Sequence, residues 1–262
     1  EVDTGNLKSG FFGDVARLKL RYANASGTEP QTIIIKFPTT DAGAFKIGLQ
    51  RGYYDRELIF YKEFAESCGL RVPKFYGGEV DPSTGASALL LEDLSYYRPG
   101  TEQPGTKMKS DAHLLVRQLG KFHARFWENA QVEALDWLPS IDTAPERFQR
   151  DFLLAWPVIS RYVGKDADES SERFGQQIAQ HIPSLKKSLA EAPRVFLHAD
   201  LRKENLFFDD TAQVAVVLDW QHCRLGRAAV DVASYLFGEA HHMDPGEEES
   251  LLHEYHVALT AE

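Results

Sequence analysis

The sequence predicts an α+β fold in two lobes, in which a small antiparallel-sheet lobe with one helix precedes a larger, mainly helical lobe. Two observations support this prediction. β-Favouring residues dominate roughly the first ninety positions, and apolar residues at helical spacing dominate the positions that follow. A polar stretch rich in Pro, Gly and Thr, from Tyr97 to Lys109, separates the two patterns. We therefore expect residues 1–94 to form the N-terminal lobe with its connector, and residues 95–262 to form the C-terminal lobe.

The N-terminal lobe is expected to contain two strand pairs with one helix between them. The predicted strands are residues 12–21, 31–37, 72–76 and 87–91. The first two flank the loop 24–28 and are expected to form a hairpin, and the turn 81–85 separates the last two. Apolar side chains at helical spacing predict the helix at residues 51–65.

The C-terminal lobe is expected to be helical, with short strands. Ser110 is the expected N-cap of a first helix, whose apolar face carries Leu115, Leu119, Phe122 and Phe126. Further helices are expected at residues 146–163, where Pro157 can introduce a kink, at 171–190 and at 228–237. A last helix is expected to start with Asp244 as its cap and Pro245 in its first turn, and an apolar strand is predicted at residues 214–218.

Composition and charge limit the class of protein. Hydrophobic residues make up 43% and charged residues 26%, which is the balance of a globular protein. The formal charge of -10 argues against nucleic acid as a partner, and no apolar run approaches the roughly eighteen residues of a membrane span. Two cysteines, Cys68 and Cys223, in a chain without a secretory signal indicate reduced thiols and a cytoplasmic location. The chain starts without Met and its last helix has no stop signal, so we expect a piece of a longer protein, of unspecified oligomeric state.

The stretch from His198 to Asn205 carries the strongest functional signal. Asp200 and Asn205 fit one tight loop, where a carboxylate can take a hydroxyl proton while an amide oxygen helps to hold a metal ion. Asp219 follows an apolar strand fourteen positions later and offers a second oxygen ligand of the kind that magnesium prefers. Together these residues indicate a phosphoryl-transfer site. Taken alone, the spacing also fits a plain turn, because Asp and Asn favour turns.

A lysine in the N-terminal lobe supplies the other half of such a site. Lys36 ends the apolar run at residues 33–35, and burying its ammonium is costly unless a carboxylate pairs with it. Glu57, on the next predicted helix, is the natural partner. In kinases, a lysine held by a helical glutamate aims its ammonium at the α- and β-phosphates of ATP. The alternative is that Lys36 reaches the surface and Glu57 lies on a solvated face.

Two further segments are weaker candidates for nucleotide contacts. Gly10 and Gly13 lie before a strand, where the backbone amides of a turn could cover phosphates, although an ordinary turn fits equally well. Backbone groups of Glu92 and Leu94, at the junction of the lobes, could bond the adenine edge, an assignment that depends on position alone.

As a set, these residues resemble the kinase-like phosphotransferase superfamily, on the branch that contains aminoglycoside phosphotransferases, choline kinases and ecdysteroid-kinase-like proteins. The matching marks span nearly the whole chain in the expected order. They are Lys36, Glu57, the Leu-Glu-Asp-Leu connector at 91–94, the loop from His198 to Asn205, the Leu-Asp-Trp-Gln run at 218–221, and Asp231. The resemblance implies a two-lobed protein-kinase-like fold that uses ATP and Mg²⁺.

The resemblance also implies a role for each matching residue of the site. Asp200 would be the catalytic base, while Asn205 and Asp219 would hold magnesium. Lys36 and Glu57 would form a phosphate clamp.

Three more residues take supporting roles by the same resemblance. His198 would brace its loop without transferring protons, and Asp231 would steady the loop. Arg202 falls where a cation could offset negative charge in the transition state, although an Arg202 that faces solvent fits nearly as well.

The sequence departs from protein kinases after Asp219. Asp-Trp-Gln replaces Asp-Phe-Gly, and only eleven residues separate Asp219 from Asp231, which leaves no room for a long activation segment. A small-molecule hydroxyl acceptor is therefore expected in place of a protein substrate. A protein kinase, and a catalytically silent pseudokinase that binds nucleotide or a partner, stay open as alternatives.

The identity of the acceptor is left open. The Asp-Trp-Gln ending and the run at 56–61 resemble ecdysteroid-kinase-like proteins, which hints at a steroid-like or other apolar alcohol. Aromatic residues that could line such a pocket, or pack in the core, are Trp127, Trp137, Phe148, Phe152, Trp156 and Tyr162. An aminoglycoside or choline acceptor would instead need carboxylates around a cation, which the acidic total charge permits.

Overall fold

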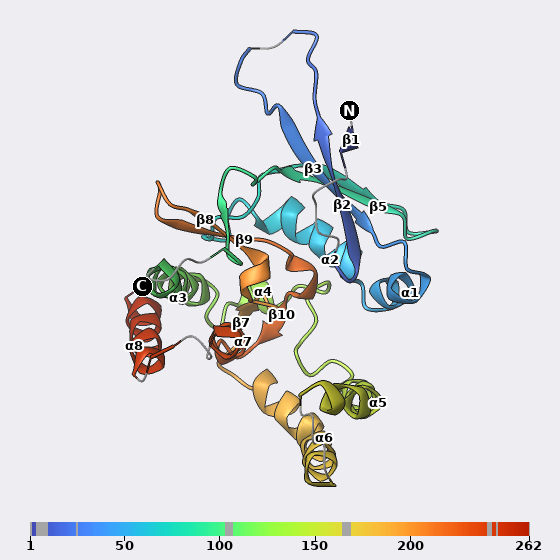
Figure 1. Ribbon diagram of the computed structural model, residues 1–262, viewed down its shortest axis with the longest axis vertical. Helices are drawn as coiled ribbons and strands as arrows, with labels where there is room; N and C mark the ends of the chain where they lie inside the picture. The colour runs from blue at the N-terminus through green and yellow to red at the C-terminus, as the bar shows by residue number, and fades with distance from the viewer. Residues whose placement is uncertain are drawn as a thin grey trace. The chain divides into compact units, whose positions relative to one another are not determined.

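The computed structural model describes residues 2–3, 10–24, 26–102, 107–163, 169–239, 243–244 and 246–261 (Figure 1). The chain divides into two compact units. The first comprises residues 1–125, 198–223 and 231–262, and the second comprises residues 126–197 and 224–230. Strands and helices occur in both units, so the predicted α+β class is confirmed.

A five-stranded antiparallel sheet dominates the first unit (Figure 1). Its strands, in spatial order, are β1 (Val2–Asp3), β2 (Gly13–Lys19), β3 (Thr32–Pro38), β5 (Ser87–Glu92) and β4 (Phe75–Val80). The expected hairpin is the β2–β3 pair, whose register sets Val15 opposite Lys36. The strand predicted at residues 72–76 begins later, at Phe75. Pro73 has no N–H to donate to a ladder, and Arg71 instead bridges Val216, outside this sheet.

The helical segment that follows β3 is longer than predicted. Helix α1 (Ala42–Gln50) was not expected, although Asp41 caps it by accepting a hydrogen bond from the Ala44 N–H at 2.7 Å. Gly52, with φ of 63°, ends that segment, and α2 (Tyr53–Ile59) begins there. Helix α2 continues into a π-helical turn, η1 (Phe60–Phe64). The single helix predicted at residues 51–65 is therefore corrected to α2 and η1, since glycine accommodates the left-handed backbone that separates α1 from them.

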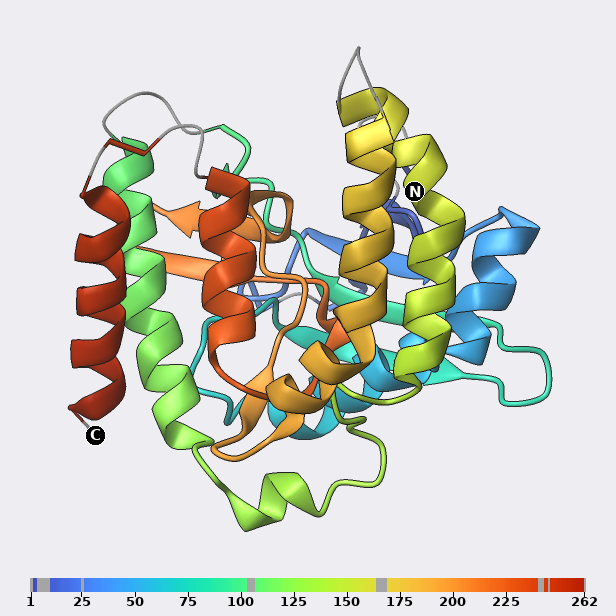
Figure 2. The same ribbon diagram turned by 90° about the horizontal axis from the view of Figure 1, so that it is seen from below.

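A helix pair and a small sheet complete the first unit. Helix α3 (Lys107–Arg125) packs along α8 (Glu247–Thr260), and both views draw the two side by side (Figures 1 and 2). The approach is close, because a Cβ at Gly120 would lie 2.7 Å from the Tyr255 carbonyl oxygen. The second sheet has the order β6 (Arg98–Pro99), β8 (Leu206–Asp209) and β9 (Val214–Val217), which confirms the strand predicted at 214–218. The 3₁₀ turn η2 (Lys203–Asn205) directly precedes β8, and the 3₁₀ turn η3 (Trp220–His222) follows β9. The unit also contains α7 (Ala229–Glu239) from Asp231 onwards.

Two predicted helix caps are wrong. Helix α3 already begins at Lys107, so Ser110 lies in its first turn and donates its hydroxyl to the Lys107 carbonyl at 2.9 Å. The N-cap of α8 is Gly246, with φ of 88°, while the Asp244 carboxylate pairs with Lys109. Pro245 lies outside the described residues. In both cases the side chain predicted to cap the helix makes another contact: the Ser110 hydroxyl bonds a carbonyl, and the Asp244 carboxylate pairs with a lysine.

The second unit is built around a helix pair and a two-stranded sheet. It contains α4 (Ala130–Glu133), α5 (Pro145–Val163), α6 (Glu169–Ala190), and the antiparallel strands β7 (Val195–Leu197) and β10 (Arg224–Gly226). Helices α5 and α6 lie side by side, so close that a Cβ at Gly175 would overlap the Trp156 ring (Figure 2). None of the helices in the described ranges combines the length and the apolar character that crossing a membrane requires.

Some of the aromatic residues predicted to line an acceptor pocket pack against other rings, and others are exposed. Phe152 stacks on Trp156 at 5.4 Å between ring centroids, and Trp137 packs against Phe196. Trp127 and Phe148 are 40% and 49% exposed. The Tyr162 side chain lies outside the described residues.

Candidate active site

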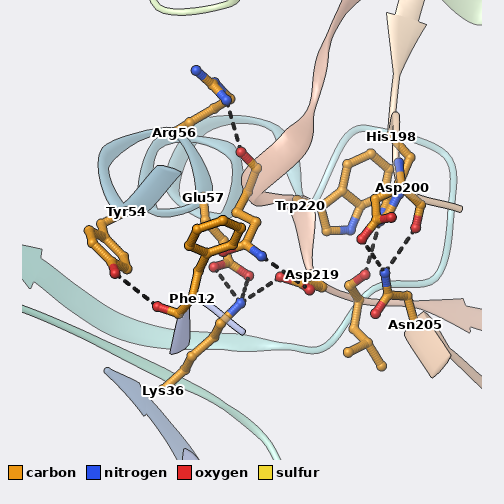
Figure 3. A network of polar contacts seen from close by, with 12 residues as sticks. Phe12, Lys36, Tyr54, Arg56, Glu57, His198, Asp200, Asn205, Asp219 and Trp220 are labelled. Carbon is orange, nitrogen blue, oxygen red and sulfur yellow. Dashed lines mark hydrogen bonds and ion pairs between the residues drawn. The ribbon is translucent and has the colours of Figure 1, made fainter. Parts of the chain in front are cut away.

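Residues from three separate elements converge on the Lys36 ammonium. Lys36 Nζ donates to both Glu57 carboxylate oxygens, at 2.8 and 2.7 Å, and to Asp219 Oδ1 at 2.6 Å (Figure 3). Lys36 comes from β3, Glu57 from α2, and Asp219 from the residues just after β9. The lysine–carboxylate cluster, as we call these three residues, confirms that Glu57 is the partner of Lys36. The alternative of a surface lysine is excluded, because the Lys36 and Glu57 side chains are 17% and 4% exposed.

The cluster carries more negative than positive charge. Burial alone would lower the pKa of Lys36, but Asp219 and Glu57 outweigh it and raise that pKa above its usual value. Burial raises the pKa of Glu57 to about 7, against the opposing effect of Lys36. For Asp219, Lys36 outweighs the effect of burial, and its pKa is lowered. The single positive charge of Lys36 is therefore shared by the two carboxylates of Glu57 and Asp219. A further cation bound at this site would bring its charge closer to balance.

Asp219 has a backbone conformation that only the surrounding contacts can hold. Its φ and ψ are 69° and 60°, in the left-handed region, which costs a residue other than glycine roughly 1 kcal/mol or more. The next residue, Trp220, is fully buried and stacks on Phe60 at 4.0 Å between ring centroids, with 9° between the ring planes. Gln221 Nε2 lies 3.4 Å from Asp219 Oδ2, and Arg56 donates to the Gln221 carbonyl at 2.9 Å. Helix α2 and η1 thus fix the direction of the Asp219 carboxylate.

Asp200 and Asn205 face each other across the 198–205 loop. Asn205 Nδ2 donates to the Asp200 carbonyl at 2.9 Å and to its carboxylate at 3.1 Å (Figure 3). Burial raises the pKa of Asp200 above its usual value, and the charges of Arg202 and His198 only partly offset that effect. A raised pKa makes this carboxylate a better proton acceptor at neutral pH. Arg202 is 54% exposed at its side chain, with Nε 3.6 Å from Asp200 Oδ2, so it faces solvent beside the carboxylate.

A buried carboxylate holds the start of this loop. Asp231 is fully buried and accepts hydrogen bonds from the backbone N–H groups of His198, at 2.8 Å, and Ala199, at 2.7 Å. Ala199 has φ of 62°, so these bonds hold a strained residue directly before Asp200. His123 on α3 contacts Asp231 at 3.3 Å and bonds the Tyr255 hydroxyl at 2.8 Å. Sequence reasoning missed His123, whose signal was one histidine among the apolar residues of a predicted helix face.

His198 acts as a brace. The Asp200 N–H donates to His198 Nδ1 at 3.2 Å, so a neutral ring carries its proton on Nε2, which donates to the Leu218 carbonyl at 2.9 Å. The Leu218 N–H in turn donates to the Asn205 carbonyl at 3.1 Å. Both ring nitrogens are engaged, which leaves His198 no free position from which to transfer a proton. Leu218 thereby joins the 198–205 loop to Asp219.

The oxygen atoms of Asp219 and Asn205 fit a hard divalent cation. Carboxylate and amide oxygens are ligands that magnesium accepts, and Mg²⁺ usually takes only one or two protein ligands and fills its shell with water and phosphate oxygens. Within the described residues, no three His, Cys, Asp or Glu side chains gather into a self-contained metal site. A cation bound to Asp219 would compete with Lys36 for its carboxylate.

The Gly10–Gly13 segment forms a turn next to Lys36. Gly10 N–H donates to the Gly13 carbonyl at 2.8 Å, and a Cβ at Gly13 would lie 3.1 Å from Lys36 Cε. The Phe12 carbonyl accepts a hydrogen bond from the Tyr54 hydroxyl at 2.8 Å, which fixes the turn to α2 (Figure 3). Ser9 lies outside the described residues. The glycine at position 13 is explained by this close approach of the backbone to the lysine.

The connector at residues 91–94 borders an open cavity. Glu92 uses its carboxylate internally, since it accepts two hydrogen bonds from Arg71, both at 2.6 Å. Leu94 is buried, and Asp93 between them pairs with Arg17 at 2.7 Å. The cavity, of about 820 Å³, begins just after the connector and is lined by residues 95–99 and the β8–β9 hairpin, among them Tyr96, Tyr97, Phe207 and Asp209, together with Arg17. Glu92 and Leu94, the predicted adenine contacts, are not among the residues that line this cavity.

Comparison with protein families and solved structures places this geometry in context. Residues 36–261 match the APH family, described as the phosphotransferase enzyme family. No curated protein matches the chain. Aminoglycoside phosphotransferase APH(3'')-Id from Streptomyces rimosus is similar with a TM-score of 0.61 and 13% identity, over 95% of this chain and 83% of that one.

Two further solved structures share the fold. The GDP and kanamycin complex of APH(2'')-IIia has a TM-score of 0.60 and 12% identity, over 97% of this chain and 77% of that one. The complex of amicoumacin kinase hAmiN with AMP-PNP, Ca²⁺ and Ami has a TM-score of 0.57 and 16% identity, over 95% and 70%. These likenesses confirm the predicted kinase-like fold. Since the family match extends from Lys36 through α8, the chain belongs to the phosphotransferase enzyme family.

Proposed function

We propose that this protein transfers the γ-phosphoryl group of ATP to a hydroxyl group of a small molecule, with Asp200 as the general base. The observation that carries this proposal is the convergence of Lys36, Glu57 and Asp219 beside the Asp200–Asn205 pair within one compact unit. A buried lysine shared by two carboxylates and a neighbouring Asp–Asn loop are the parts that phosphoryl transfer uses for positioning and charge compensation.

Lys36 is the proposed phosphate-binding residue. In the structure its ammonium is bound by Glu57 and Asp219. A triphosphate can replace Asp219 as a partner of Lys36, while Glu57 keeps the ammonium in place. Asn205 and Asp219 would then hold Mg²⁺, which supplies positive charge to the phosphate oxygens when bound. The Gly10–Gly13 turn, whose backbone approaches Lys36, would cover the phosphates, and backbone groups of Glu92 and Leu94 would bond the nucleobase.

Asp200 is the proposed proton acceptor. As the acceptor oxygen forms its bond to phosphorus, the hydroxyl proton passes to the Asp200 carboxylate and the bond to the leaving nucleoside diphosphate breaks. The Asn205 amide holds that carboxylate in one orientation through its 3.1 Å hydrogen bond. Arg202, exposed beside it, would offset negative charge that develops outside the buried cluster.

A small hydroxylated molecule is the proposed acceptor. Only eleven residues separate Asp219 from Asp231, so the chain lacks the long segment on which protein kinases dock peptides. The similar structures named above include complexes with kanamycin and with Ami, the ligand of an amicoumacin kinase. We keep steroid-like and other apolar alcohols, aminoglycosides and choline-like alcohols as the classes to test. Cys68 and Cys223 are both buried and neither forms a disulfide within the described residues, which favours the reducing cytoplasm as the location.

The proposal is tested with a mass-resolved screen of hydroxylated metabolites and antibiotics in the presence of Mg-ATP. The expected product gains one phosphate. Asp200→Asn should then lower turnover on that acceptor by about two to four orders of magnitude, because the general base is lost. Glu204→Gln is the matched control, since Glu204 is an exposed carboxylate in the same loop, and it should leave turnover within about twofold.

Two results would contradict the proposal. Nucleotide binding without transfer to any alcohol in a broad library would favour a silent nucleotide-binding protein. Phosphorylation of a peptide array in preference to the library would favour a protein kinase. Full turnover by Asp200→Asn would leave the reaction class in place but remove Asp200 as its base.

A further inference from the structure

Three buried polar atoms around the Asp219–Gln221 segment have no hydrogen-bond partner among the described residues. They are Tyr61 Oη, Arg56 Nε and Gln221 Oε1, on side chains that belong to residues only 2%, 7% and 6% exposed. An unpaired polar atom in the interior destabilises the folded state, so native proteins contain few of them. Their concentration next to the lysine–carboxylate cluster indicates that this region completes its hydrogen bonds in a different, ligand-bound state.

Gln221 contacts Asp219 of the cluster through its Nε2, and Tyr61 is the one of the three that follows Glu57 on the same helical segment. It lies one helical turn after Glu57, in the π-helical turn η1, and residues four apart share a helix face. Such turns insert an extra residue into a helix and occur frequently at functional sites. The Tyr61 ring is fixed by packing, at 5.4 Å from Phe60 and 6.2 Å from Phe75 between ring centroids. The hydroxyl is thus held at a defined place without a bond of its own.

The charges near the Tyr61 hydroxyl are those of the cluster. Burial raises the pKa of Tyr61 well above its usual value, and the negative charges of Glu57 and Asp219 raise it further. The phenol therefore keeps its proton at neutral pH. It is a hydrogen-bond donor within electrostatic range of two carboxylates that share one lysine.

Nucleotide binding changes the number of donors that these carboxylates have. On the proposed function, Lys36 turns part of its ammonium towards phosphate oxygens, and Glu57 then loses hydrogen bonds in a site from which water is excluded. Glu57 keeps the ammonium as a partner but loses part of its hydrogen bonding, and a further donor would restore it. We propose that Tyr61 is a positioning residue, whose hydroxyl donates to the Glu57 carboxylate in the nucleotide-bound protein and keeps Glu57 behind Lys36.

This inference rests on the proposed function and extends it to a residue that does not touch the substrate. The packed ring alone would be served equally well by phenylalanine, which carries no unpaired hydroxyl. The hydroxyl destabilises the resting protein, and the binding of nucleotide is the event that gives it a partner. Loss of the hydroxyl is therefore expected to weaken nucleotide binding without destabilising the nucleotide-free protein.

Tyr61→Phe is the decisive variant, because it removes the hydroxyl and retains the ring. The dissociation constant of Mg-AMP-PNP, measured by titration calorimetry without acceptor, should rise by about tenfold, since a hydrogen bond to a charged group is lost. The melting temperature of the nucleotide-free protein should stay equal or increase. Tyr22→Phe is the control. Its hydroxyl donates to the Pro30 carbonyl at 2.9 Å on the exposed hairpin, and its loss should leave nucleotide affinity unchanged.

A double-mutant cycle identifies the partner of the hydroxyl. In a Glu57→Met background, where no carboxylate remains to accept the bond, Tyr61→Phe should weaken binding less than twofold. A full tenfold effect in that background would show that the hydroxyl acts on another group and would overturn the assignment.

Two results in the single variant would also overturn it. Wild-type affinity in Tyr61→Phe would show that nucleotide binding does not use the hydroxyl. A lower melting temperature of the nucleotide-free variant would show that the hydroxyl is already bonded in the resting protein. Because both readouts are taken without acceptor, they are independent of the transfer screen, in which failure of the proposed function appears as absence of a phosphorylated product.

Discussion

The two halves of the site are held together by different forces. The lysine–carboxylate cluster depends on charge, since Lys36 bonds Glu57 and Asp219 at 2.6 to 2.8 Å. The 198–205 loop depends on backbone hydrogen bonds, because the buried Asp231 carboxylate accepts the N–H groups of two consecutive residues. The first arrangement has unpaired atoms and an excess of negative charge around it. The second has a partner for each carboxylate oxygen of Asp231 and for both ring nitrogens of His198.

This difference separates the part that rearranges from the part that stays fixed. A site whose lysine is bound to its own Asp219 has to exchange that contact when a polyanion and a cation arrive. A base has to keep its geometry, and a loop with a strained Ala199 keeps it only if neighbouring groups fix the backbone. We infer that the cluster is the adaptable half and that the loop is the rigid half.

The largest effect is expected when the support of the rigid half is removed. Asp231→Asn loses the charge on two hydrogen bonds and presents an amide N–H to backbone N–H groups, at a fully buried position next to His123. The free energy of unfolding, measured with urea, should fall by about 3 kcal/mol, as for other broken buried pairs. Asp210→Asn is the control. Asp210 is paired but exposed, so its loss should cost at most about 1 kcal/mol. Equal effects of the two variants would contradict a special role for Asp231.

A smaller and pH-dependent effect is expected for the adaptable half. Lys36→Met leaves Glu57 and Asp219 without their shared cation, and should lower the free energy of unfolding by about 2 kcal/mol at pH 8. The folded pKa of Glu57, about 7, already lies above its value of 4.5 in an unfolded chain, so its contribution to stability is greatest at low pH and declines as pH rises through 7. Removing Lys36 raises that pKa further, so the difference from the wild type should grow from pH 5 to pH 8.

Urea unfolding at several pH values, in EDTA, measures this prediction. A difference that is constant with pH would show that Glu57 and Asp219 do not share protons in the variant. A variant with wild-type stability throughout would show that the cluster matters for ligands alone and would remove the contrast in charge between the two halves.

A third prediction concerns the contact between the Gly10–Gly13 turn and the cluster. A Cβ at Gly13 would lie 3.1 Å from Lys36 Cε, and Lys36 cannot yield freely because its ammonium is bound on two sides. Gly13→Ala should therefore weaken Mg-AMP-PNP binding about fivefold by shifting the ammonium. Gly238→Ala, where a Cβ would meet nothing within 4 Å, is the control and should bind like the wild type. Unchanged affinity in Gly13→Ala would show that the turn adapts.

Residues with a chemical reason for their position were the ones that the sequence predicted best. Lys36 and Glu57 were paired on the argument that a buried ammonium needs a carboxylate, and Asp200 was joined to Asn205 by spacing. Both pairs are present. Asp231 was expected to steady the loop, and its carboxylate accepts hydrogen bonds from the backbone N–H groups of His198 and Ala199. The hairpin and most long helices also followed from apolar periodicity.

Contacts between distant elements were not predictable from the sequence. Helix α1 was not predicted, because Gly43 and Gly48 lower the helix propensity of residues 40–52. The N-cap residue Asp41 is the one helix signal in that segment. The structure explains Gly48, since a Cβ there would lie 2.7 Å from the Tyr54 hydroxyl. His123 sits among apolar residues, and its role depends on Asp231, which is 108 residues away in the chain, on α7. The spacing of residues along the chain predicts one helix or strand at a time, and therefore does not predict contacts between separate elements.

The smallest effect tests whether strain in the rigid half matters. Ala199 and Gln213 both have left-handed backbones, with φ of 62° and 53°, the first beside Asp200 and the second in the β8–β9 turn. Glycine relieves that strain but gains freedom in the unfolded chain, so each glycine variant should change the free energy of unfolding by less than about 1 kcal/mol. Turnover separates them. Ala199→Gly should lower it several-fold, because Asp200 then follows a flexible residue, whereas Gln213→Gly should not. Equal turnover would show that the bonds from Asp231 fix the loop without help from the residue at position 199.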